Sequence, residues 1–221
     1  AERNMGCANS RYHPKNADLV KLKKKYETDA IKSAKLLNIW VIGGNKTRTL
    51  QLAEIISQQQ NYMLITEDLL LQKEMASGTE RSNIVREILD DKGVICPGIV
   101  LDMVVETILE KLDEIKGVVF HGIPRNREQA LHLQRLVGAA SLVIYCELKG
   151  ESLRMALTDE GEEPSTIKSK VDHFQKSVLQ LSKHKTTMTV DGEKDPMELV
   201  EDCLEKIVEQ ENGIKLLPEA Q

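Results

Sequence analysis

N-I-W-V-I-G-G-N-K-T-R-T-L-Q, residues 38–51, is the stretch that decides the fold of this chain. It opens with an apolar, strand-forming run at 39–42, breaks at Gly43-Gly44, crosses a polar loop and continues from Leu50 with apolar residues at helical spacing. A buried strand that ends in a glycine turn before a helix is the arrangement that wraps backbone N–H groups around a phosphate. We therefore expect a phosphate-binding turn between a strand at 38–43 and a helix at 50–60.

The turn lacks the side chains that such a loop uses. A working phosphate loop has small residues, then a lysine that reaches the β- and γ-phosphates, then a serine or threonine hydroxyl for Mg²⁺. On the frame set by motifs further along the chain, Arg48, Thr49 and Leu50 stand where Gly-Lys-(Gly/Ser) is expected, and the bulk of Arg48 blocks a close backbone approach. The residues of this degenerate loop are Gly43, Gly44, Lys46, Arg48 and Thr49.

Apolar strand-like runs alternate with helix-like segments along the rest of the chain. Further strands are expected at 62–65, 117–121, 141–147 and 187–190. Further helices are expected at 68–77, 82–91, 99–116, 127–137, 166–185 and 196–210. This alternation predicts an α/β fold, a three-layer, doubly wound, five-stranded parallel sheet that binds ligands at the carboxyl ends of its strands.

Four ordered motifs carry a resemblance to a known family. They are the turn at 43–51, T-E-D-L-L at 66–70, the segment 93–97 followed by V-L-D-M at 100–103, and H-G-I-P-R at 121–125 with Gln129. Through them, residues 37–208 resemble the adenylate kinases, the short-form nucleoside monophosphate kinases. The resemblance implies a P-loop nucleoside monophosphate kinase-like fold with a shortened lid. The domain would span 16–210, between an irregular leader at 1–15 and a tail at 211–221.

The resemblance also assigns the acceptor side of the site. It implies that Thr66, Arg125 and Gln129 bind a monophosphate, with Arg125 on the phosphate and Gln129 on the adenine edge. Arginine suits this role because its planar guanidinium makes bidentate, charge-assisted hydrogen bonds. A second phosphate-binding arginine of the family appears here as Leu71 or Gln72, so this pocket has lost positive charge.

The donor side departs further from the family. The family's phosphate-loop lysine is Thr49, its magnesium-side threonine is Gln51, and the aspartate that helps to organise Mg²⁺ is His121, a poor ligand for a hard cation. The lid stretch 154–164 is short and acidic, which would repel a triphosphate. The family's lid arginine positions read Ala156, Glu160 and Lys170.

These departures lead to two functional hypotheses of different classes. The first is a pseudoenzyme, an adenylate-kinase-like scaffold or regulatory subunit that binds an unidentified protein partner and retains weak affinity for an AMP-like ligand. The second is an active but divergent nucleoside monophosphate kinase that transfers phosphate from ATP to AMP, with Lys46 or Arg48 in place of the missing lysine. No metal site and no cofactor are expected under the first hypothesis, whereas the second requires Mg²⁺ and ATP.

Composition excludes several other classes. The chain has 221 residues and a net charge of −5, which argues against nucleic-acid binding because the phosphate backbone favours clustered positive charge. No apolar run approaches the ~18 residues that span a bilayer. The four cysteines have no metal-ligand spacing and are expected to be reduced thiols, which is typical of a cytoplasmic protein. They are Cys7, Cys96, Cys146 and Cys203.

The first ten residues contain a motif of a different kind, a candidate acylation signal. Met5 to Ser10 fits the pattern Met-Gly-x-x-x-Ser, so Gly6 is a candidate for myristoylation and Cys7 for palmitoylation if Met5 is a true start; otherwise the leader is ordinary disordered chain. Residues 16–37 are expected to be helical, with Asn16 or Asp18 as the cap, and the lysine run 21–25 to form a solvated face or to contact anionic lipid. A membrane-associated or cytoskeletal, axonemal location therefore stays open beside the cytoplasmic one.

Overall fold

This computed structural model describes residues 12–44, 46–158 and 163–215. The candidate acylation residues Gly6 and Cys7 lie outside these ranges, as does the acidic part of the predicted lid at 159–162. The side chain of Lys46 also lies outside the described part of the chain.

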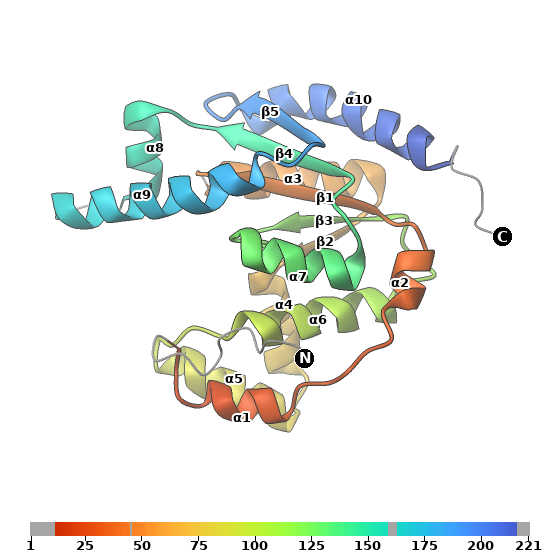
Figure 1. Ribbon diagram of the computed structural model, residues 1–221, viewed down its shortest axis with the longest axis vertical. Helices are drawn as coiled ribbons and strands as arrows, with labels where there is room; N and C mark the ends of the chain where they lie inside the picture. Colours follow the sequence, from red (N-terminus) through yellow and green to blue (C-terminus); the bar gives the residue numbers. More distant parts are fainter. Residues whose placement is uncertain (1–11, 45, 159–162, 216–221) are drawn as a thin grey trace.

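The core is a five-stranded, fully parallel sheet with the order β2-β3-β1-β4-β5 (Figure 1). The strands are β1 Leu37–Gly43, β2 Met63–Thr66, β3 Gly117–His121, β4 Leu142–Glu147 and β5 Thr187–Asp191. The predicted α/β fold class and all five strands are confirmed. Because parallel strands point in one direction, their carboxyl ends meet at one edge of the sheet.

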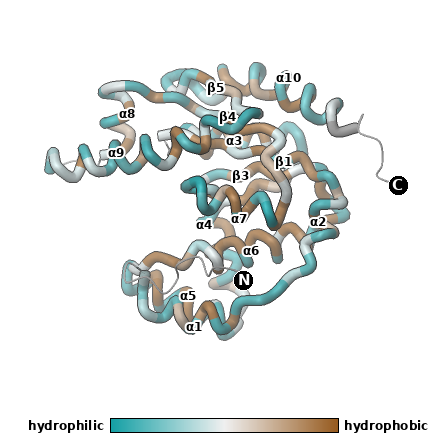
Figure 2. The backbone as a smooth tube through the Cα atoms, viewed as in Figure 1, coloured by the Kyte–Doolittle hydropathy of each residue, from teal (hydrophilic) through white to brown (hydrophobic). Residues whose placement is uncertain are grey.

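Helices cover both faces of the sheet, and the side chains of β1 alternate between them. Ile39 and Val41 pack with residues of α3 and α10, whereas Trp40 and Ile42 pack with residues of α6 and α7 on the other face. Trp40 is 2% exposed and donates a hydrogen bond to Asn38 Oδ1 at 2.9 Å, so it belongs to the core as expected. Figure 2 shows the hydrophobic residues concentrated on the strands and on α6. Burial on both faces explains why β1 reads as a continuous apolar run.

Ten helices fall within the described ranges. They are α1 Asn16–Lys21, α2 Asp29–Ser33, α3 Lys46–Gln60, α4 Glu67–Ala76, α5 Glu80–Asp90, α6 Pro97–Glu110, α7 Arg127–Val137, α8 Gly150–Leu157, α9 Pro164–Leu181 and α10 Pro196–Lys215. Most match the sequence-based prediction to within a few residues, and 127–137 matches at both ends. Helix α3 begins four residues earlier than predicted, so Arg48 and Thr49 lie in its first turn. Helix α8 was not predicted, α6 ends at Glu110 rather than near 116, and α10 continues five residues past 210.

The prediction of one helix over 16–37 is wrong. Two short helices stand there, and between them the chain crosses α6 without helical structure (Figure 1). Lys23 Nζ lies 3.8 Å from Asp102 of α6, and Lys24 Nζ lies 3.3 Å from Glu106. These lysines therefore pair with acids of the protein itself rather than forming only a solvated face, and such tertiary contacts outweigh local helix propensity.

The cysteines behave differently from one another. Cys146 and Cys203 are free and buried, and burial raises the pKa of each thiol to about 12. Cys96 is disulfide-bonded, which corrects the expectation that all four cysteines are reduced. Among the described residues, none of the helices combines the length and apolar character that crossing a membrane requires.

Candidate functional site

The sheet brings four segments together at the carboxyl edge of its strands. In the strand register, Val41 and Thr66 are both partners of His121, and Gly43 is the partner of Cys146. In an open α/β sheet this edge is where ligands bind. We divide the edge into two parts. The α3 half consists of Gly43, Gly44, Arg48, Thr49 and His121, and the α4 half consists of Thr66, Glu67, Arg125 and Gln129.

The α3 half is centred on a hydrogen bond between two distant segments. Thr49, at the start of α3, is 2% exposed, and its Oγ1 lies 2.9 Å from Nε2 of His121 at the end of β3. These are the two positions where the resemblance leads us to expect a lysine and an aspartate. Here a hydroxyl and an imidazole contact each other, so these two positions supply neither an ammonium for a phosphate nor a carboxylate for a metal ion.

The two glycines of the turn are packed against the protein's own chain. A Cβ at Gly43 would lie 2.8 Å from Thr49 Cγ2 and 2.9 Å from the carbonyl oxygen of Cys146. A Cβ at Gly44 would lie 2.7 Å from Leu153 Cδ1 of α8 and 3.6 Å from Phe174 Cζ of α9. Gly44 itself is buried. The sequence predicts a degenerate phosphate-binding turn in which the bulk of Arg48 blocks a close backbone approach. In the structure, the two glycines accommodate the close approach of α3, β4 and α8.

Arg48 is exposed and bonds to the loop between β5 and α10. Its Nη1 donates to the carbonyl oxygen of Glu193 and, at 3.3 Å, to that of Lys194. The same loop is tied to α8, because Ser152 Oγ donates to Glu193 Oε1 at 2.7 Å. The guanidinium of Arg48 thus links the first turn of α3 to the loop between β5 and α10.

The α4 half keeps its basic side chain, but that side chain is paired. Arg125 Nη2 lies 2.5 Å from Oε2 of Glu67, the first residue of α4. The side chain of Glu67 is 15% exposed and that of Arg125 is 58% exposed, so the arginine lies at the surface and the carboxylate is half-buried. In the adenylate kinase motif that T-E-D-L-L at 66–70 resembles, the position of Glu67 is a glycine. The Glu67 carboxylate therefore forms an ion pair with the arginine that the resemblance assigns to a phosphate.

The two other residues predicted on this side also have internal partners. Thr66 caps α4, and its Oγ1 accepts a hydrogen bond from Leu69 N at 3.1 Å. Gln129 is 5% exposed, and its Oε1 accepts from the backbone N–H of Arg125 at 2.6 Å. The structure brings Arg125 and Gln129 together, and the amide oxygen of Gln129 accepts the backbone N–H of the turn at Arg125.

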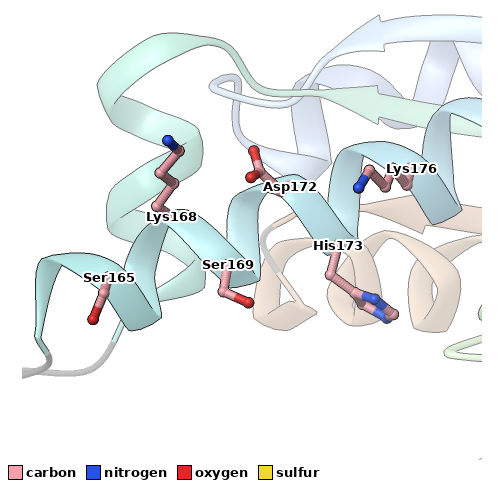
Figure 3. Close-up of a pocket in the computed structure, with 6 residues that line it drawn as sticks. All are labelled: Ser165, Lys168, Ser169, Asp172, His173 and Lys176. Carbon is pink, nitrogen blue, oxygen red and sulfur yellow. The ribbon is translucent and has the colours of Figure 1, made fainter.

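A separate groove runs along α9 (Figure 3). It has a volume of about 380 Å³, and its side chains have mixed charge. Its lining residues are Ser165, Lys168, Ser169, Asp172, His173 and Lys176. None of them is a residue that the sequence assigned to the site. Within the ranges that the structure describes, no group of three histidine, cysteine or acidic side chains could hold a metal ion.

Sequence reasoning missed three residues that contact the predicted site residues: Glu67, Leu153 and Phe174. Glu67 was read only as part of a motif, although an acid in place of glycine, next to a retained arginine, is a signal that could have indicated the ion pair. Leu153 and Phe174 carried no such signal, because their approach to Gly44 depends on how α8 and α9 fold back over the turn.

The comparisons with known proteins agree with this fold. The chain is 31% identical to adenylate kinase isoenzyme 1 of Cyprinus carpio over 157 residues, which cover 67% of this chain and 79% of the relative. It is 29% identical to adenylate kinase isoenzyme 1 of Homo sapiens over 147 residues, 63% of this chain and 75% of the relative. Adenylate kinase isoenzyme 5 of Homo sapiens matches at 27% over 115 residues, 52% of this chain and 20% of the relative. A scan against protein-family models finds no match.

Proposed function

This chain belongs to the adenylate kinase family, and from that premise we propose that it is a pseudoenzyme, a non-catalytic member that acts as a scaffold or regulatory protein. The observation that carries the proposal is the hydrogen bond between Thr49 and His121. It joins the two positions at which a phosphate-binding lysine and a metal-organising aspartate are expected.

The physical argument concerns charge. Phosphoryl transfer is catalysed almost entirely by positioning and by cations that neutralise the migrating group, and removal of a single such contact lowers the rate by about 10²–10³-fold. Thr49 brings no positive charge to the phosphates, and His121 is a weak ligand for Mg²⁺. The loss of both groups at one place predicts a rate too small to serve metabolism.

Packing supports the same proposal. Leu153 and Phe174 approach Gly44 closely enough that a Cβ there would meet them at 2.7 and 3.6 Å. A phosphate cradle needs backbone N–H groups that face open space, whereas here Gly44 is packed against α8 and α9. ATP would have to displace these helices before its phosphates could reach the turn.

The α4 half supports weak monophosphate binding. Arg125, Gln129 and Thr66 remain in place, but a phosphate must compete with Glu67 for the Arg125 guanidinium. We therefore propose that any nucleotide affinity favours AMP over ATP and does not require Mg²⁺.

The alternative is an active, divergent kinase in which Arg48 or Lys46 replaces the missing lysine. Arg48 already donates to the carbonyl oxygens of Glu193 and Lys194, which disfavours this role. Nothing in the described part of the chain bears on the side chain of Lys46.

A coupled assay of purified protein with ATP, AMP and Mg²⁺ tests the proposal. We expect no phosphoryl exchange above the background of a protein-free reaction. A robust rate that disappears in the Arg125→Ala variant would establish an active enzyme instead, because a contaminating kinase would be unaffected by that substitution. Calorimetry adds a second criterion, since tight ATP binding that depends on Mg²⁺ would also contradict the proposal.

The scaffold part of the proposal is tested separately in cells. If the protein acts by binding other proteins, the double variant Arg125→Ala, Gln129→Ala should correct the defect of cells that lack the wild-type protein. Failure of this variant at wild-type abundance, together with rescue by the wild-type chain, would show that the α4 half is needed.

A further inference from the structure

Helix α5 lies far from the sheet, and residues 12–26 pack against its outer side (Figure 1). In Figure 1, α5 and α1 lie together at the edge opposite α10, and α5 packs against α4 and α1. Residues 12–26, which we call the N-terminal brace, start beside α5 and end on α6. The brace contains α1 and the polar segment that follows it, visible as the hydrophilic stretch after α1 in Figure 2.

The first anchor of the brace is Asn16. Its side chain is fully buried and makes three hydrogen bonds. Asn16 Nδ2 donates to the carbonyl oxygens of His13 at 3.1 Å and Val94 at 2.9 Å, and Oδ1 accepts from Cys96 N at 2.7 Å. This residue was expected to be a helix cap, but it instead binds the backbone of the loop between α5 and α6.

Further contacts fasten the brace to the end of α5. His13 Nε2 lies 3.1 Å from Asp91 Oδ2, and Lys15 pairs with Glu87. A Cβ at Gly93 would lie 3.0 Å from His13 Cβ, so the two segments touch directly. Leu19, one turn further along the brace, is fully buried. The brace is therefore packed on α5 as well as hydrogen-bonded to the loop behind it.

The second anchor is Glu106 of α6. Lys24 Nζ lies 3.3 Å from this carboxylate, and the Tyr26 hydroxyl donates to it. Arg81 of α5 donates to the same carboxylate through Nη1 at 2.9 Å and Nη2 at 2.5 Å, and Nη2 also reaches Glu74 of α4 at 2.5 Å. Burial alone would raise the pKa of Glu106, but hydrogen bonds from Arg81 and Tyr26 outweigh it and lower the pKa to about 2. The carboxylate thus stays ionised and joins the brace to three helices.

We propose that the N-terminal brace is a conformational lock that holds the α4–α5 pair against α6. Because α4 begins at Glu67, the lock also fixes the position of the carboxylate that occupies Arg125. The proposal rests on the contacts of the brace and does not depend on whether the protein catalyses a reaction.

Hydrogen exchange of the full chain, followed by mass spectrometry, tests the lock. In Asn16→Ala, the amides of residues 80–92 should exchange about tenfold faster than in the wild type, because the Val94 carbonyl oxygen and the Cys96 N–H lose their side-chain partner and α5 opens locally. The amides of β1 and β4 should be unchanged. Lys32→Ala is the matched control, since Lys32 pairs with Asp29 at the surface of α2, outside the brace.

Two outcomes would overturn the proposal. Unchanged exchange at 80–92 would show that the Asn16 anchor does not hold α5 in place, and equal acceleration in every element would show that Asn16 serves global stability. Should Asn16→Ala fail to fold, Tyr26→Phe decides the matter, because it removes only the hydroxyl that bonds to Glu106. We then expect a local acceleration of about threefold at 80–92, and its absence would count against the lock.

Discussion

In both the α3 half and the α4 half of the carboxyl edge, the protein's own residues pair with one another, but at different depths. In the α3 half, a threonine that is 2% exposed bonds to a histidine, and α8 and α9 pack against Gly44. In the α4 half, an acid bonds to an arginine whose side chain is 58% exposed. Leaving the buried Thr49 hydroxyl without its hydrogen bond destabilises by about 1–3 kcal/mol, whereas an ion pair made by a largely exposed guanidinium contributes about 0.2–1 kcal/mol. The first closure is therefore part of the core, and the second can be opened by a competing anion.

Cys146, which packs against Gly43 of the α3 half, and a cysteine introduced into α4 should show the largest contrast in reactivity. Burial raises the pKa of the Cys146 thiol to about 12, so at pH 8 it holds about a thousandfold less thiolate than an ordinary cysteine. Alkylation with iodoacetamide, followed by peptide mapping, should therefore be slow at Cys146 and accelerate as the pH rises. Leu69→Cys places a thiol in α4 at a position 46% exposed and should react at the ordinary rate. Equal rates at the two positions would contradict a core-like α3 half.

Restoring the family's lysine tests whether the α3 half retains space for it. Thr49→Lys buries an ammonium beside an imidazole and removes the hydrogen bond to His121, so we expect a loss of about 3 kcal/mol in the free energy of unfolding. Urea denaturation measures this loss. Thr49→Ser keeps the hydroxyl and removes only a methyl, and should lose about 1 kcal/mol. A lysine variant as stable as the wild type would mean that the cradle is open.

A methyl group at Gly43 probes the packing of the same half more gently. The added Cβ would lie 2.9 Å from a backbone oxygen of β4, which cannot move away as a flexible side chain would. Gly43→Ala should therefore destabilise by about 2 kcal/mol, which thermal unfolding can detect. Gly213→Ala in α10 is the control, because a Cβ there meets no atom within 4 Å and should be neutral or stabilising. If both substitutions behaved alike, tight packing at the turn would be ruled out.

The smallest effect concerns AMP in the α4 half. Glu67→Gln keeps the shape of the side chain but removes the charge that competes for Arg125, so AMP affinity should rise by up to about fivefold in calorimetry. Adenosine, which lacks the phosphate, should show no gain. Asp68→Asn makes the same charge change at the next residue and controls for a general electrostatic effect. A similar gain in both variants would show that Glu67 does not compete specifically with AMP for Arg125.

Local sequence patterns were sufficient to predict much of the fold. The apolar run of β1 and the helical spacing after Leu50 predicted a strand and a helix that the structure contains. Local patterns failed at 16–37, where Lys23, Lys24 and Tyr26 bond to α6 and the chain leaves the helical path. A helical spacing of apolar residues cannot reveal an acidic partner that lies about eighty positions away in sequence.

For the candidate site, the sequence by itself determined which chemical groups are present: threonine at 49, histidine at 121, glutamate at 67 and arginine at 125. Tertiary structure alone decided which of them meet. The Thr49–His121 and Glu67–Arg125 contacts each join segments more than fifty residues apart, and they depend on the register of β1, β2 and β3 and on the start of α3 and α4. Hydrophobic periodicity fixes which face of an element is buried, but the pairing of polar side chains at strand ends follows only when the elements have packed.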